Sequence, residues 1–318
     1  MNRSVAAAEA LRTGLEGCPL EFDPRLVEDA VLLAIERHER EVQRRFRRQR
    51  DPLYEIAEPD VRESGFHALN ARWFVELSLD DPLHRALEQE PSVAAGVSRC
   101  LVVPVVRARQ EYADLKPDPQ DKGPPTLLLA LRVTTLVDRD GLPPFLWREL
   151  LHIADMLDPD FGFEPELPLL EGSAPLANVL RQRYRVLWDT AVDGRLATRD
   201  QLAPGGKEAR RREFLSMFSM LGESGERWFE HFFRDPRASH TEFVAFATRP
   251  GRDGEADASG QCWLCRMPTT SFHPKPTALP TETLAAIRGD FPDWEPACGL
   301  CTQCAGLYGA LAPPAHRR

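Results

Sequence analysis

Four cysteines near the end of the chain have the spacing of a metal site. They form two C-x-x-C pairs, Cys262 with Cys265 in "CWLC" and Cys301 with Cys304 in "CTQC", with residues 266–300 between them. Zinc takes four soft ligands in a tetrahedron, and a C-x-x-C knuckle brings two thiolates to one side of a tight turn. The two pairs therefore predict one structural zinc ion, and no second zinc is expected.

Two further residues offer alternatives within this ligand set. Cys298 forms an overlapping pair with Cys301 in "CGLCTQC", and His273 could replace one thiolate. We prefer Cys301 with Cys304, because residues 299–300 then form the approach to the knuckle. A set of reduced, metal-free thiols is the competing interpretation. Two correctly spaced pairs in a segment too small for a core of its own favour the metal.

A second constellation lies on "PFLWRELLHIADML" in the middle of the chain. Its apolar residues recur with the period of a helix, and Arg148, Glu149, His152 and Asp155 fall in one polar stripe. Glu149 and His152 occupy the acid and second histidine positions of H-E-x-x-H, the motif that binds zinc and supplies a general base. Arg148 stands where the first histidine would be. An amphipathic helix with its charged face in water is the competing interpretation.

A later helical segment, "RYRVLWDTAVDGRL", places Asp189 and Asp193 four residues apart on one face. Together with the apolar segment 127–135 and the Glu149/His152 helix, this order resembles the gluzincin branch of zincin metallopeptidases, over residues 127–196. In that family a strand borders the substrate cleft, one helix carries H-E-x-x-H, and a later helix carries an acidic ligand.

The resemblance implies a role for each matching residue. Glu149 would be the general base and His152 a zinc ligand. Asp189 would be the third ligand, and Asp193 would orient His152 from outside the ligand shell. The chain departs from the pattern at Arg148, whose guanidinium has no lone pair to give, and in having Asp instead of the usual Glu at position 189.

Because His152 and Asp189 are too few ligands for a catalytic zinc, we expect a zincin-like protein with an impaired centre. Arg148 would replace the positive charge of the lost zinc by pairing with Asp189 or Glu149. The former substrate cleft would bind a peptide or protein partner. The ordinary alternative pairs Arg185 with Asp189 on a solvent face.

Other functions compete with this one. An active peptidase would need a substitute ligand such as Asp155. A non-enzymatic interaction or scaffold protein would use its zinc module to dock a macromolecule, and its helical domain would be purely structural. A di-iron site would need a second E-x-x-H, and the nearest candidate, Asp81-x-x-His84, begins with Asp.

The remaining pattern predicts an α+β fold, mostly helical with a small sheet. Strands are expected at 98–109 and 126–137, where β-branched and apolar residues run together between turn-rich segments. The expected helices cover 23–50, 60–77, 82–90, 143–157, 175–198, 206–222, 225–234, 238–247 and 280–291. We expect a zincin-like domain over 1–248, a polar linker at 249–260, and a zinc module at 261–318 that resembles treble-clef or zinc-ribbon modules.

Composition limits the class of partner. The 318 residues carry a formal charge of −9, which argues against binding nucleic acid through bulk electrostatics. No apolar run reaches the length of a membrane span and no signal peptide is recognised, so we expect a cytoplasmic protein. Seven arginines crowd into residues 37–50. We expect them to pair at i,i+4 with Glu36, Glu39 and Glu41, and an anionic partner is the alternative.

Overall fold

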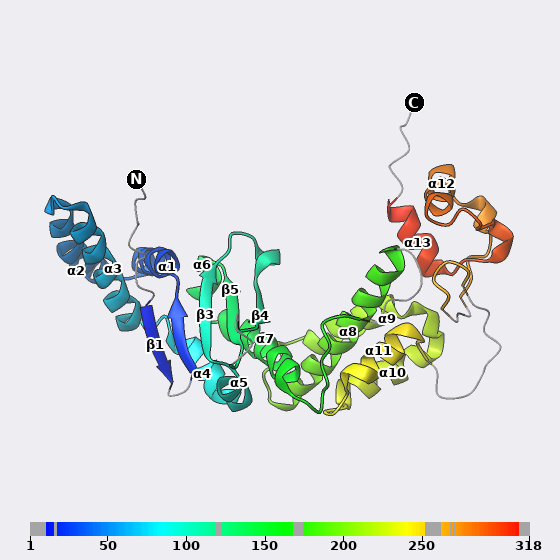
Figure 1. The fold of residues 1–318 in the computed structure, drawn as a ribbon, viewed down its shortest axis with the longest axis horizontal. Coiled ribbons are helices and arrows are strands. Elements are labelled where there is room, and N and C mark those ends of the chain that lie inside the picture. The colour runs from blue at the N-terminus through cyan, green and yellow to red at the C-terminus, as the bar shows by residue number, and fades with distance from the viewer. Residues whose placement is uncertain are drawn as a thin grey trace. The chain divides into compact units, whose positions relative to one another are not determined.

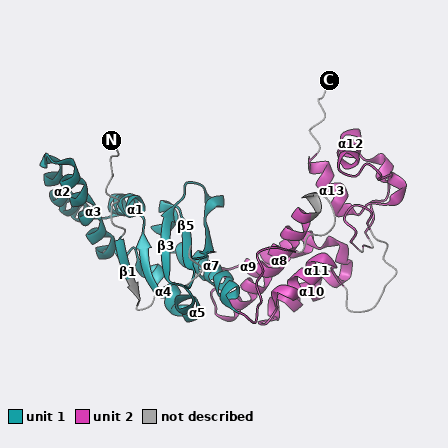
Figure 2. Cartoon of the chain, viewed as in Figure 1, with its two compact units in different colours: residues 1–158 teal, residues 159–318 magenta. Residues whose placement is uncertain are grey.

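The computed structural model describes residues 11–15, 18–118, 123–167, 174–251, 262–267, 269 and 271–311 (Figure 1). The chain divides into two compact units, Met1–Asp158 and Pro159–Arg318 (Figure 2). Each unit encloses its own cluster of buried apolar side chains.

Unit 1 is built on a mixed five-stranded sheet with the strand order β1-β2-β3-β5-β4. The strands are β1 (Leu11–Leu15), β2 (Cys18–Phe22), β3 (Arg99–Pro104), β4 (Tyr112–Lys116) and β5 (Thr126–Leu131). β2, β3 and β5 run parallel, and β1 and β4 pair antiparallel at the two edges. The two expected strands are β3 and β5. β5 ends before the expected 137, because Arg132 is held by Glu111 and residues 133–136 turn into a helix.

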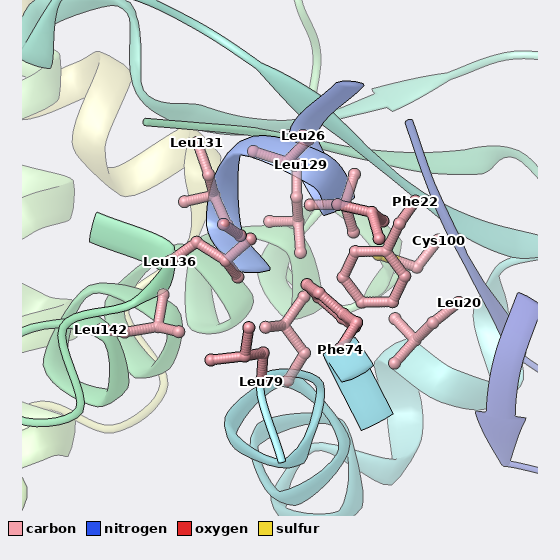
Figure 3. Close-up of a cluster of buried hydrophobic side chains, with 14 of the residues drawn as sticks. Leu20, Phe22, Leu26, Phe74, Leu79, Cys100, Leu129, Leu131, Leu136 and Leu142 are labelled. Atoms are coloured by element: carbon pink, nitrogen blue, oxygen red, sulfur yellow. The ribbon is translucent and has the colours of Figure 1, made fainter. Parts of the chain in front are cut away.

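The helices of unit 1 cover this sheet and supply most of its core. They are α1 (Pro24–Arg37), α2 (Arg40–Arg50), α3 (Pro59–Glu76), α4 (Asp81–Gln89), α5 (Pro91–Gly96), α6 (Val133–Leu136) and α7 (Leu142–Leu157), with short 3-10 turns η1 (Asp51–Glu55) and η2 (Ala108–Gln110). Phe22 of β2 and Phe74 of α3 meet with ring centroids 4.9 Å apart in this core (Figure 3). Burying large apolar side chains from both layers is what fixes the helices on the sheet.

The helix expected over 23–50 is two helices in the structure. Asp23 caps the first, since its Oδ1 accepts the backbone N–H of Arg25 at 2.9 Å. The break falls at His38, which is extended, and the Gln43 side chain stabilises it by donating to the His38 carbonyl at 2.8 Å. Apolar residues recur at helical spacing on both sides of His38, so the sequence pattern did not reveal the break between the two helices.

Unit 2 begins with a helical body around one long central helix. Its elements are α8 (Ala174–Thr198), α9 (Gly206–Met217), η3 (Ser219–Ser224), α10 (Gly225–Arg234) and α11 (His240–Thr248). α8 contacts α9, α10 and α11, and aromatic rings such as Phe214, Phe229 and Phe243 fill the space between them. Gly194 lets α10 approach α8 closely, because a Cβ at this position would lie 1.8 Å from the Phe233 carbonyl oxygen.

The C-terminal part of unit 2 has a small core of its own. It contains η4 (Pro276–Ala278), α12 (Thr281–Asp290), η5 (Pro296–Cys298) and α13 (Thr302–Leu311), packed around Ile287, Trp294 and Leu300. The sequence predicted α12, at 280–291. Most of the expected linker, residues 252–260, lies outside the described residues, so a domain boundary at 249–260 stays a prediction.

The expected class, α+β with predominant helix and a small sheet, is confirmed. Within the described part of the chain, no helix has both the length and the apolar character that crossing a bilayer requires.

Candidate metal centre

Cys262, Cys265, Cys301 and Cys304 come together as the sequence predicted. All four are buried, and their Sγ atoms lie within 4.8 Å of one another. The Sγ atoms of Cys262 and Cys304 are 4.0 Å apart, and those of Cys265 and Cys301 are 3.9 Å apart. A tetrahedral zinc with bonds of about 2.3 Å separates its sulfurs by about 3.8 Å, whereas a disulfide needs about 2.05 Å. The cluster has the size of a tetrathiolate metal site.

Local backbone geometry builds each knuckle. In the first, the N–H of Arg266 donates to the Cys262 carbonyl at 2.8 Å, and Arg266 adopts a φ of +55° to close the turn. In the second, Gly299 has a φ of +80°, and a Cβ there would lie 3.2 Å from the Phe272 ring. Glycine is favoured at this position for both reasons. α13 then starts at Thr302 and carries Cys304 in its first turn.

The backbone also donates to the sulfurs. The N–H of Cys301 lies 3.3 Å from Sγ of Cys262, and the N–H of Cys304 lies 3.3 Å from Sγ of Cys301. Hydrogen bonds with the other three cysteines of the cluster lower the pKa of the Cys262 thiol. In contrast, hydrogen bonds with the other three cysteines raise the pKa of the Cys304 thiol. Four ionised thiols this close repel one another, so a divalent cation is what would let all of them ionise together.

The two alternative ligands lie outside the cluster. Cys298 is exposed and is not part of the grouping of sulfurs. The backbone N–H of His273 donates to the Leu300 carbonyl at 2.7 Å, and its ring is not part of the grouping either. Nδ1 of His273 is buried without a hydrogen-bond partner among the described residues.

Arg183 of α8 is a buried cation beside the cysteines that the sequence analysis missed. Its side chain is 1% exposed, Nη1 donates to the Ala247 carbonyl at 3.3 Å, and Nη2 donates to Gln303 Oε1 at 2.6 Å. Burial lowers the pKa of Arg183, and negative charge on the nearby cysteine sulfurs only partly offsets this. The sequence did contain a signal that Arg183 is buried. Arg183 lies three residues after Leu180 and four before Leu187, which places it on the apolar face of α8.

Gln303 joins the second knuckle to the helical body. It lies between the clustered cysteines Cys301 and Cys304, and besides accepting from Arg183 it donates through Nε2 to the Met217 carbonyl at 3.4 Å. One side chain within the knuckle therefore contacts both α8 and the end of α9.

The polar stripe of α7 is only partly exposed. Asp155 is buried, and Arg148, Glu149 and His152 are half-buried. Oε2 of Glu149 accepts the backbone N–H of Ala113 on β4 at 2.9 Å. A hydrogen bond from a neutral donor holds this carboxylate on the edge strand of the sheet.

Asp189 and Asp193 lie on one face of α8, as expected, but a different arginine neutralises them. Arg210 of α9 donates through Nε to Asp193 at 2.7 Å and through Nη1 to Asp189 at 3.2 Å. Burial disfavours the charge of Arg210, yet the two aspartates raise its pKa above the usual value. The expected Arg185–Asp189 pair is also present, at 3.7 Å. Because Asp189 and Asp193 belong to unit 2 and Glu149 and His152 to unit 1, their convergence on one cleft stays a prediction.

A second group of candidate ligands lies between α10 and α11. His231, Asp235 and Glu242 bring their ligand atoms within 4.8 Å of one another, next to a cavity of about 640 Å³ walled by Trp228 and Phe246. This group is partly exposed, and Nε2 of His231 lies 3.0 Å from Oε1 of Glu242. This hydrogen-bonding contact accounts for the closeness of His231 and Glu242 without a metal. No motif spacing marked these residues in the sequence.

Comparison with protein-family models, with curated proteins and with solved structures finds no match for this chain. The likeness to zincins and to treble-clef modules therefore depends on the residues quoted above. The geometry itself defines a protein with a buried four-cysteine cluster that could hold a metal ion such as zinc.

Proposed function

We propose that this chain is a zinc-stabilised binding protein without peptidase activity. One zinc ion, held by Cys262, Cys265, Cys301 and Cys304, would fix the C-terminal module of unit 2, and the protein would act by binding a protein or peptide partner. The observation that carries the proposal is the set of four buried sulfurs at tetrathiolate spacing.

The chemistry of the ligands supports a structural role for this zinc. A catalytic zinc keeps one coordination position open for water or substrate and usually has three protein ligands, whereas four thiolates close the coordination sphere. All four cysteines are at most 5% exposed, so substrate would have no approach to the metal. Metal binding would then contribute to folding rather than to a reaction.

The other acidic residues support the absence of peptidase chemistry. The Glu149 carboxylate is engaged by a backbone N–H, and Asp189 and Asp193 are neutralised by Arg210. Arg148 has no lone pair to offer a metal. These contacts favour a binding function over peptidase chemistry.

Metal analysis of the purified chain tests the zinc site. We expect about one zinc per chain, and loss of that zinc in Cys262→Ser and in Cys304→Ser. Cys298→Ser is the matched control, because Cys298 is exposed and outside the cluster, and it should keep its zinc. Wild-type protein that remains free of metal after production in zinc-rich medium would refute the proposal.

A zincin-like origin with an impaired centre is the second candidate. It is favoured by the contact between α7, which carries Glu149 and His152, and the antiparallel edge strand β4. The resemblance assigns the strand that borders the substrate cleft to residues 127–135, which contain most of β5, and β4 pairs with β5 in the same sheet. This candidate requires His152 and Asp189 to face one cleft.

Restoring the missing histidine tests this second candidate. In the Cys304→Ser background, which removes the structural zinc, Arg148→His should bind about one zinc per chain. Arg107→His, at an exposed position of the same unit, should bind none. If the wild-type chain already holds two zinc ions and cleaves protein in an EDTA-sensitive way, the impaired centre is wrong and the active peptidase is right.

A further inference from the structure

The outer face of α2 carries a continuous stripe of arginines, here called the arginine stripe: Arg40, Arg44, Arg47 and Arg48. These positions follow the pattern i, i+4, i+7 and i+8, which places them within about 100° of the helix circumference. All four side chains are exposed. α2 lies at one end of unit 1 beside α3 (Figure 1).

The opposite face of α2 fixes the helix to the unit. Phe46 is 2% exposed and meets the ring of Trp73 on α3 edge-on, with centroids 5.4 Å apart. The indole N–H of Trp73 donates to Gln49 Oε1 at 2.8 Å, and Arg45 pairs with Glu76. The arginine stripe is therefore displayed from an anchored helix.

The expected internal partners of the stripe do not form. Among the described residues, none of its four arginines makes a side-chain hydrogen bond or an ion pair, although the sequence pattern predicted pairs with Glu36, Glu39 and Glu41. The break at His38 separates Glu36 from α2, so it cannot pair by helical spacing. Four like charges on two turns repel one another, and that repulsion is relieved when an anionic partner binds.

The pattern of charge favours a protein partner over a nucleic acid. The chain as a whole carries −9, so a long polyanion would be repelled beyond the stripe. Arg40 and Arg44 are about 6 Å apart along the helix axis. This separation matches that of carboxylates spaced i,i+4 on a partner helix. Apolar surface lies nearby on η1 and α3, where Tyr54 is 58% exposed and Val61 is 55% exposed. Arg50 lies over the Tyr54 ring at 5.8 Å and links the two elements.

We propose that the arginine stripe and the neighbouring Tyr54 form a docking site for an acidic amphipathic helix of a partner protein. Guanidinium groups bind carboxylates in a planar, two-point geometry, and the apolar face of such a helix would cover the Tyr54 ring. The proposal deepens the binding function proposed above by naming the chemistry of the partner. It does not depend on the zinc site.

Fluorescence anisotropy with a labelled, glutamate-rich helical peptide tests this site on the full-length chain. Arg44→Gln/Arg48→Gln should weaken binding about tenfold, since each exposed ion pair contributes up to about 1 kcal/mol and 1.4 kcal/mol corresponds to a factor of ten. Arg25→Gln/Arg109→Gln makes the same charge change at exposed positions of the same unit, and its affinity should stay within about twofold of wild type. Binding should weaken as salt is raised.

Two further probes define the outcomes that overturn the proposal. A DNA duplex and anionic phospholipid vesicles are measured with the same three proteins. If either binds more tightly than the peptide and loses that binding in Arg44→Gln/Arg48→Gln, the partner is not an acidic protein helix. If the two double variants bind the peptide equally, the stripe is not a docking site. Zinc content should be the same in all three proteins, so failure here is distinct from failure of the zinc proposal.

Discussion

Replacing Arg183 with methionine removes a buried positive charge next to the four cysteines and keeps a side chain of similar length. A zinc tetrathiolate carries a net charge of about −2, and Arg183 is 1% exposed, so little solvent screens the interaction. The guanidinium contacts Gln303, which lies between the ligands Cys301 and Cys304, so the charge is about one side chain away from the sulfurs.

The size of the effect follows from this arrangement. A positive charge about 8 Å from a net charge of about −2 interacts with it by about 4 kcal/mol at an effective dielectric constant of about 20, which sets an upper bound of about 1000-fold in affinity. Loss of a partner outside the ligand shell typically costs about 10- to 100-fold in metal affinity. We therefore expect Arg183→Met to weaken zinc binding by about 30-fold, and to move the pH at which zinc binds upward because the thiols must ionise without the cation.

Competition against a chromophoric zinc chelator, repeated across a pH series, measures both quantities. Arg183→Lys keeps the charge and should recover most of the affinity. Gln303→Ala removes the hydrogen bond to Arg183 and leaves the charge, so it should cost less than Arg183→Met. The reasoning is refuted if Arg183→Met binds zinc with wild-type affinity and pH dependence, or if Gln303→Ala weakens binding equally.

Three other changes probe the helical body of unit 2. Gly194→Ala should lower the free energy of unfolding by at least about 2 kcal/mol in urea denaturation, because its Cβ would meet a carbonyl of α10, whereas Gly289→Ala has open space and should be neutral or stabilising. Asp193→Asn should cost about 2 kcal/mol, because Arg210 loses its most buried carboxylate partner but keeps Asp189 and Glu213, and a loss below about 1 kcal/mol would contradict the buried pair. Burial lowers the pKa of His240 in the folded chain, so its neutral form is favoured there. The contribution of His240 to the free energy of unfolding should therefore be fully present above a pH of about 6.5, the unfolded-chain pKa, and be lost as the pH falls through the lowered folded-state pKa. His240→Gln should abolish that pH dependence in thermal melts, and an unchanged profile would exclude His240 as its source.

The cysteine cluster could be predicted because its signal is local. A C-x-x-C knuckle encodes its own turn, and two knuckles leave few ways to arrange four sulfurs. The amphipathic helix α7 was predictable for a similar reason, since periodicity within one segment decides it. The edge strands β1 and β4 were not predicted, because a five-residue strand is defined by its pairing with another part of the chain.

The buried cations were missed for a physical reason of the same kind. Arg183 and Arg210 look like ordinary surface arginines in sequence, and only tertiary contacts show that their charges are compensated inside the fold. Arg210 meets aspartates that lie on another helix, and Arg183 faces cysteines from the C-terminal module. The sequence assigned the role of internal cation to Arg148, whereas in unit 2 Arg210 is the cation that neutralises Asp189 and Asp193.

The exposed position of Cys298 provides an internal reference for measuring how many of the other cysteines in the module react with a thiol reagent. A gentle alkylating reagent should modify this thiol quickly while the four clustered sulfurs stay protected, because burial and coordination of the proposed zinc would both suppress their nucleophilicity. Stripping the ion would bring the whole module within reach of the reagent. Mass spectrometry of alkylated protein would then report, molecule by molecule, which copies of the chain carry metal inside a cell extract.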